Sequence, residues 1–191
     1  MDYAGAKYPL KWFRGKVYDN TIVKAIHAKM GSVSEAVITD VRKQRTTKVR
    51  PVGLNTVHLL KTASKSFGMS AQETLRIAEH LYLRGFTTYP RTESTDFSEN
   101  FDFKEILEEQ SDHPEWGDFA KNLLKNGHNK PKKGLNAGDH PPITPVRAAY
   151  RGELGEREWK IYAYITRSFL GCISRDATYD SVAVMFECSG E

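Results

Sequence analysis

The sequence predicts an α+β protein in which a mainly helical, winged-helix-like unit is flanked by β-strands. Three observations predict this fold class. Residues 33–52 are rich in β-branched side chains in alternation, residues 55–85 have the pattern of two helices joined by a short turn, and residues 178–186 favour a final strand. With 191 residues, the chain is long enough to bury a core without disulfide bonds.

Composition excludes several classes of protein. Charged residues make up 27% of the chain and no apolar run approaches the length of a membrane span, which excludes a membrane-embedded protein. Cys172 and Cys188 are the only cysteines, so there is neither a disulfide framework nor a zinc site of four cysteines, and we expect a reducing compartment. The first five residues lack the pattern of a secretory signal, so we do not expect export.

The N-terminal third predicts a short helix followed by a β-ribbon. The helix covers residues 19–30 and ends at Gly31. In the ribbon, Ile38 and Val41 belong to opposite faces of a first arm, and residues 46–52 supply the second arm. Pro51-Val52-Gly53 then interrupts the chain.

Residues 55–85 carry the clearest helix signals. Asn55-Thr56 is a candidate N-cap and the first helix stops at Phe67-Gly68. Ser70 and Glu73 form a capping box for a second helix that continues to Gly85. The β-favouring residues 86–89 follow directly, and a helix-turn-helix with a following strand is typical of winged-helix DNA-docking modules.

The C-terminal half predicts three further helices and a strand. The helices cover residues 103–110, 115–126 and about 154–173, and the strand covers residues 178–186. Residues 127–139 contain glycines, asparagines and Pro131 without periodicity, which predicts a loop.

Charge is segregated along the chain although the net charge is only +4. Residues 42–50 carry five cations and no acid, and residues 121–133 carry five more. Residues 93–118 carry ten carboxylates against one lysine. This pattern favours a basic surface that holds a polyanion, with ordinary solvated faces as the alternative.

The segment from Thr87 to Glu93 carries several hydroxyl and charged side chains close together. In an extended conformation Thr87, Tyr89, Arg91 and Glu93 share one side, which makes a phenol and a guanidinium neighbours. Arginine suits a phosphate, and its fixed charge favours the ionised phenol, as a tyrosine nucleophile attacking a phosphodiester requires. The alternative is that Tyr89 is one of nine tyrosines and serves in packing.

A second cluster places His140 on a proline-stiffened loop, Gly138-Asp139-His140-Pro141-Pro142-Ile143-Thr144-Pro145. Rigid flanks lower the entropy lost when a contact forms. His140 could donate to a phosphate oxygen or pass a proton to a leaving hydroxyl, and the alternative is a loop histidine without a functional role.

The sequence resembles a type IA DNA topoisomerase in the run Tyr89-Pro90-Arg91-Thr92-Glu93-Ser94 and in the His140 cluster downstream. The particular residues of these motifs resemble those of the eukaryotic topoisomerase III, beta type. Similarity also runs through Leu54-Asn55-Thr56-Val57, residues 77–82, residues 99–102 and Cys188-Ser189-Gly190. Most of the chain after residue 50 is covered.

The resemblance implies roles for named residues. Tyr89 matches the nucleophile that forms a 5′-phosphotyrosine, Arg91 the residue that positions and activates it, and His140 the contact near the scissile phosphate. Glu93 matches an acidic motif position. We also expect nucleic-acid contacts from four ribbon cations and two residues of the tyrosine segment, namely Arg42, Lys43, Arg45, Lys48, Thr87 and Glu93.

The resemblance also implies a domain organisation within the family's toroid. Residues 1–53 would be a β-ribbon part of the hinge domain with an N-terminal helical entry. Residues 54–177 would be the helical, tyrosine-bearing domain, and residues 178–191 the strand that returns to the hinge domain.

The sequence departs from the family in lacking the Toprim domain, since it contains no Asp-x-Asp. The resemblance therefore implies Mg²⁺ for the full enzyme, bound outside this chain, with no metal site in it and no ATP requirement. We expect the chain to be the central portion of a larger enzyme and inactive alone.

The implied partners are single-stranded DNA, with RNA as an alternative, the remaining topoisomerase domains and family-type accessory proteins, and no membrane. The implied location is the nucleus, with the cytoplasm as a second site. Two other functions stay open: a winged-helix nucleic-acid-binding module without chemistry, and a tyrosine recombinase, against which the absence of a recognisable Arg/His/Arg set speaks.

Overall fold

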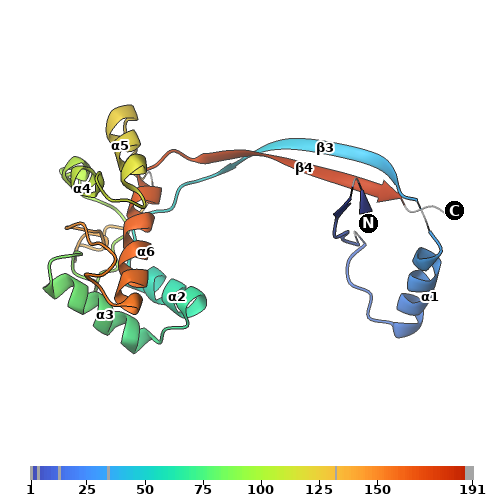
Figure 1. The fold of residues 1–191 in the computed structure, drawn as a ribbon, viewed down its shortest axis with the longest axis horizontal. Coiled ribbons are helices and arrows are strands. Elements are labelled where there is room, and N and C mark those ends of the chain that lie inside the picture. The colour runs from blue at the N-terminus through green and yellow to red at the C-terminus, as the bar shows by residue number, and fades with distance from the viewer. Residues whose placement is uncertain (1, 4, 13, 34, 132, 188–191) are drawn as a thin grey trace. The chain divides into compact units, whose positions relative to one another are not determined.

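The computed structural model of the protein describes residues 2–3, 5–12, 14–33, 35–131 and 133–187. Its elements are β1 (Asp2–Tyr3), β2 (Ala6–Lys7), α1 (Asn20–Gly31), β3 (Val37–Lys48), α2 (Thr56–Phe67), α3 (Ala71–Leu83), α4 (Phe103–Gln110), α5 (Gly117–Asn126), α6 (Glu156–Cys172) and β4 (Ala177–Glu187). Figure 1 labels the helices α1 to α6 and the two long strands, β3 and β4. The chain divides into two units, one of residues 47–178 and one of residues 1–46 with 179–191. Residues 188–191, which include the Cys188 motif and the end of the expected return segment, lie outside the described residues.

The unit that contains both termini has no core of buried side chains among its described residues. Strands β1 and β2 pair antiparallel, and α1 begins after Asp19, whose carboxylate accepts from the Thr21 amide at 2.8 Å. The helix predicted over residues 19–30 is thereby confirmed. None of the described side chains of this unit is buried.

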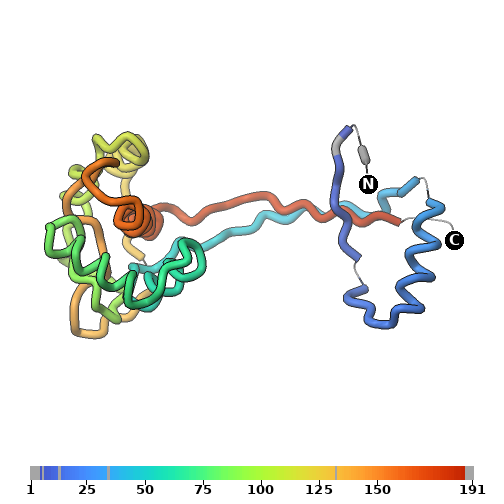
Figure 2. Tube along the Cα trace, turned by 60° about the horizontal axis from the view of Figure 1, so that its bottom comes forward, coloured from blue at the N-terminus to red at the C-terminus, as the bar shows by residue number. Residues whose placement is uncertain are grey.

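The predicted β-ribbon exists, but its second arm is not the predicted one. Residues 37–48 form a single strand, β3, and its partner is β4, more than a hundred residues later. Figure 2 shows the two strands side by side. The hairpin prediction is wrong because residues 41–46 contain no glycine, proline or asparagine to make a tight turn, so the chain stays extended.

The helix pair of the other unit is confirmed by its caps. The Asn55 side chain accepts from the His58 amide at 3.0 Å, and α2 ends at Gly68, whose φ of 63° is left-handed. Ser70 accepts from the Glu73 amide at 3.2 Å and caps α3. The second half of the capping box is absent, because the Glu73 carboxylate instead pairs with Arg157 of α6.

The segment after α3 is not the regular strand that the sequence predicted. Thr87 forms an isolated bridge with Pro145, and the Thr88 amide donates to the Thr144 carbonyl at 2.9 Å. Pro90 interrupts the pairing because proline has no amide hydrogen to donate. Among the described residues, the helix pair is therefore followed by a short bridge, and this bridge is not extended into a wing strand.

Helices α4, α5 and α6 lie in the same unit as α2 and α3, as Figure 1 shows, and contribute side chains to its core. They lie within two or three residues of the predicted bounds, and the described part of residues 127–139 is a loop as predicted. The core gathers apolar side chains from all five helices and the connecting segments, among them Leu59, Leu81, Phe86, Leu107, Ala120, Tyr162 and Phe169. Among the described residues, no helix has the length and apolarity that a membrane crossing requires.

Candidate active site

The Tyr89 ring lies between two other aromatic rings. Its centroid is 5.2 Å from that of Tyr82 on α3 and 4.8 Å from that of His140, with interplanar angles of 69° and 65°. Tyr89 is half-buried, and no described residue forms a hydrogen bond with its hydroxyl group. The two neighbouring rings therefore pack against Tyr89 in T-shaped geometry and leave its phenol oxygen available.

Arg91 is exposed and paired with a carboxylate that the sequence analysis did not assign to the site. Its Nε and Nη2 donate to Oε1 of Glu79 at 2.8 and 2.6 Å. These hydrogen bonds and the Glu79 charge raise the pKa of Arg91, and Tyr89 adds to this effect. The neighbour expected for the guanidinium was the phenol, but its direct partner is Glu79.

The tyrosine and histidine loops are joined by Asp139. Its carboxylate accepts from the Ser94 hydroxyl at 2.6 Å and from the Glu93 amide at 2.8 Å. These two hydrogen bonds, the Ser94 one first, lower the pKa of Asp139 well below its usual range. The Thr92 hydroxyl donates to the His140 carbonyl at 2.7 Å, which adds a second link. Tyr89 and His140, 51 positions apart in sequence, are thus brought together by polar contacts as well as by their rings.

The start of α2 fixes the other side of the tyrosine loop. The Thr56 hydroxyl donates to the Pro90 carbonyl at 2.7 Å and accepts from the Thr92 amide at 2.9 Å. Gly53 packs so closely that a Cβ there would lie 2.7 Å from the Pro142 ring and 2.9 Å from the Thr95 carbonyl. Only glycine fits between the two loops without displacing one of them.

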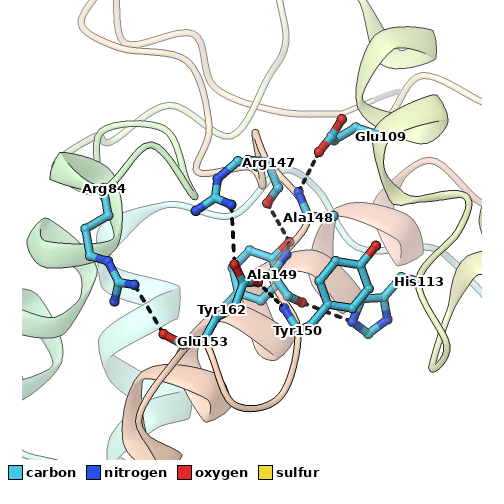
Figure 3. Close-up of polar contacts among 9 residues, drawn as sticks. All are labelled: Arg84, Glu109, His113, Arg147, Ala148, Ala149, Tyr150, Glu153 and Tyr162. Atoms are coloured by element: carbon cyan, nitrogen blue, oxygen red, sulfur yellow. Dashed lines mark hydrogen bonds and ion pairs between the residues drawn. The ribbon is translucent and has the colours of Figure 1, made fainter.

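The downstream end of the histidine loop is anchored on α6, as Figure 3 shows. The Tyr162 hydroxyl donates to the Arg147 carbonyl at 2.8 Å and accepts from the Ala149 amide at 3.1 Å. Glu109 accepts from the Ala148 amide at 2.9 Å. Burial raises the pKa of Tyr162, so this hydroxyl stays protonated and serves as a structural donor.

The expected nucleic-acid contacts fall into different environments. Thr87 is only 2% exposed, which does not fit the expected contact with nucleic acid, since the bridge to Pro145 takes the residue into the core. Glu93 is exposed. The ribbon cations lie exposed on β3, and one of them is paired with a neighbouring acid, Arg42 with Asp40 at 2.6 Å. The structure thus brings together Tyr89, Arg91, His140 and Glu93 in one unit.

Sequence reasoning missed Glu79 and Asp139 as site residues. Asp139 had a signal, since it directly precedes His140 between a glycine and a proline pair. Glu79 had none, because a glutamate within a helix is ordinarily a solvated residue. In the described part of the chain, no three His, Cys, Asp or Glu side chains converge as a metal site.

Comparison with known proteins gives consistent results. The family model described as DNA topoisomerase matches residues 2–191. Human DNA topoisomerase 3-beta-1 is 42% identical over 189 residues, which are 95% of this chain and 22% of that protein. DNA topoisomerase 3-beta of rice is 40% identical over 98% of this chain and 22% of its own length. The chain spans about a fifth of the length of these relatives.

A solved structure shares the fold. Full-length topoisomerase I from Thermotoga maritima superposes with a TM-score of 0.60 and 22% sequence identity, covering 92% of this chain and 29% of that one. The family match spans the tyrosine and histidine loops and the ribbon alike. The chain belongs to the type IA DNA topoisomerase family.

Proposed function

We propose that this chain is the tyrosine-bearing portion of a type IA topoisomerase, and that Tyr89 cleaves one nucleic-acid strand by transesterification. The observation that carries the proposal is the Tyr89 hydroxyl, which is available in a loop where Arg91 and His140 are both neighbours. Arginine is the side chain best suited to hold a phosphate by two parallel hydrogen bonds.

The proposed step exchanges one phosphodiester bond for another. The Tyr89 oxygen attacks phosphorus and gives up its proton, the bond to the 3′ oxygen breaks, and the strand leaves with a 3′-hydroxyl while a 5′-phosphotyrosine forms. His140 is positioned to donate to a phosphate oxygen or to pass a proton to the leaving oxygen. A second strand passes through the gap, and the 3′-hydroxyl then reverses the reaction, so ATP is not needed.

The remaining parts of the proposal follow the family. Residues 54–177 would form the tyrosine domain, and residues 1–53 with 178–191 a hinge domain that lets the gate open. As the family resemblance implies, Mg²⁺ would be held by a Toprim-bearing part of the enzyme. The substrate would be single-stranded DNA, with RNA as an alternative, the location the nucleus, and the partners the remaining topoisomerase domains and accessory proteins.

The winged-helix mode of DNA docking is supported by the α2–α3 pair alone. The two helices follow each other across Gly68 and Met69, as helix-turn-helix motifs require. The wing would be reduced to the Thr87–Pro145 bridge.

Covalent trapping tests the proposed chemistry. The chain, supplemented with a Toprim-bearing fragment and Mg²⁺, is incubated with a single-stranded oligonucleotide and resolved on a denaturing gel, with Tyr89→Phe as control. We expect an adduct that carries a label from the 3′ end of the oligonucleotide and is absent in Tyr89→Phe. An adduct carrying the 5′-end label would indicate recombinase polarity, and no adduct would leave the binding-module alternative.

A further inference from the structure

One face of α3 contacts both members of the tyrosine–arginine pair. Glu79 and Tyr82 are three residues apart, so their side chains lie on the same side of the helix. Glu79 pairs with Arg91, and Tyr82 lies edge-on against Tyr89. The adjoining face of α3 is fixed in the core by buried side chains, namely Thr74, Ile77, Ala78 and Leu81. A rigid helix thus presents two contacts to a loop that carries the reacting group.

The Glu79 carboxylate accepts hydrogen bonds from one edge of the Arg91 guanidinium, and the other edge stays free of described partners. Nε and Nη2 both donate to Oε1 of Glu79, at 2.8 and 2.6 Å, and these two atoms form the side edge of the planar group. No described residue accepts from Nη1. The end edge, made of Nη1 and the outer hydrogen of Nη2, is therefore available for two parallel hydrogen bonds to a phosphate.

The proposed function gives this arrangement a consequence. We infer that Glu79 is a positioning residue, which holds the Arg91 guanidinium by its side edge so that its end edge is presented to the scissile phosphate. The inference rests on the proposed role of Tyr89 as nucleophile. A flexible arginine that is 54% exposed would otherwise sample many rotamers and lose entropy on binding.

The charge of Glu79 separates this role from ordinary substrate binding. A carboxylate beside the phosphate site repels the polyanion, so Glu79 should not strengthen binding of single-stranded DNA. A residue that slows cleavage when removed, without weakening binding, acts on the geometry of the reacting groups. If Glu79 and Arg91 formed an ordinary surface ion pair without a role in the reaction, removing Glu79 would have little effect on the cleavage rate or on binding.

The first test reads the position of Arg91 without any activity. In ¹⁵N-labelled protein, the Arg91 Nε–H resonance, assigned by its loss in Arg91→Lys, reports whether the side-edge hydrogen bond holds. We expect a slowly exchanging signal in the wild type and in Glu79→Gln, because the amide oxygen can still accept. In Glu79→Ala the signal should broaden or vanish through exchange with water.

The second test separates cleavage from binding. Single-turnover cleavage is measured with the Toprim-bearing fragment and Mg²⁺, and the dissociation constant for the oligonucleotide is measured by fluorescence anisotropy. Glu79→Ala should slow cleavage by about tenfold to a hundredfold, in the range for a misplaced group at a reacting centre, while binding is unchanged or tighter. Glu79→Gln should recover most of the rate.

A matched control comes from the same helix. Glu73 also pairs with an exposed arginine, Arg157, but forms no hydrogen bond or ion pair with the described residues of the tyrosine loop. Glu73→Ala should leave the Arg91 resonance and the cleavage rate unchanged, and thermal unfolding should show both alanine variants folded. Cleavage at the wild-type rate in Glu79→Ala, or equal slowing in the alanine and glutamine variants, would overturn the inference. If the wild type itself forms no adduct, the proposed function fails and the inference fails with it.

Discussion

The rings of Tyr89 and His140 meet edge to face, with centroids 4.8 Å apart and an interplanar angle of 65°. Their loops are additionally joined through Asp139, which follows Gly138 and precedes His140. The histidine is therefore held beside the phenol before any substrate arrives. A group in this position can serve the reaction without a large movement of the loop.

The first prediction concerns His140. His140→Ala should slow single-turnover cleavage by about tenfold to a thousandfold, the range for a positioned donor or general acid. Binding of the oligonucleotide should stay near the wild-type value, because one side chain among many phosphate contacts is lost. Equal losses of binding and cleavage would indicate a docking residue instead.

The second prediction concerns Arg91. Arg91→Ala should slow cleavage by about a hundredfold or more, since a charge-assisted contact at the reacting centre is lost, and should weaken binding much less. Arg91→Lys should restore binding but only part of the cleavage rate, because an ammonium lacks the planar fork. Arg157→Ala, which removes another exposed arginine of the same unit, is the control and should leave both quantities unchanged.

The third prediction concerns the basic ribbon. Replacing Lys43, Arg45 and Lys48 by glutamine should weaken binding mainly through phosphate contacts, and the salt dependence of binding should fall by at most about one unit of slope for each cation. Anisotropy titrations at several salt concentrations measure this slope. Lys104→Gln, in the acidic segment of the chain, is the control. An unchanged slope in the triple variant would show that this strand does not contact nucleic acid.

How far the sequence predicts this structure depends on how local each cause is. Asn55, Gly68 and Ser70 act on residues three to five positions away, and the helix ends that they predict are confirmed. The partner of β3 is distant in sequence, and no local pattern identifies it.

The candidate site shows the same division. Tyr89, Arg91 and His140 stand out by residue type and spacing, whereas the carboxylates that organise them do not. Glu79 becomes visible only when α3 packs beside the tyrosine loop, and the role of Asp139 only when two loops meet. Thr87 is a case in which a local pattern predicted too much. Alternation along an extended segment predicts that Thr87 shares one face with Tyr89, but the bridge to Pro145 buries the Thr87 side chain.

The fourth prediction concerns Asp139 and acid. Its pKa is lowered by the Ser94 and Glu93 hydrogen bonds, so the folded state favours the ionised form and gains stability wherever the unfolded carboxyl is also ionised. This contribution is fully present above a pH of about 4, the ordinary aspartate value, and is lost as the pH falls further. Asp139→Asn should therefore unfold at lower urea concentration than the wild type at pH 6, and the difference should shrink below about pH 4. A difference independent of pH would mean that the charge of Asp139 does not matter.

The last prediction concerns the buried His113. Its ring stacks on Trp116 at 3.7 Å, its Nε2 donates to the Ala149 carbonyl and its Nδ1 accepts from the Glu115 amide, so both nitrogens are satisfied in the neutral form. Burial lowers the pKa of His113. The unfolded histidine takes up a proton near pH 6.5 while the folded one does not, so acid favours unfolding. The free energy of unfolding should fall as the pH drops from about 7.5 to 5.5, and urea titrations of His113→Gln should show a smaller fall, since glutamine does not titrate. An equal fall in both proteins would assign the pH dependence to other groups.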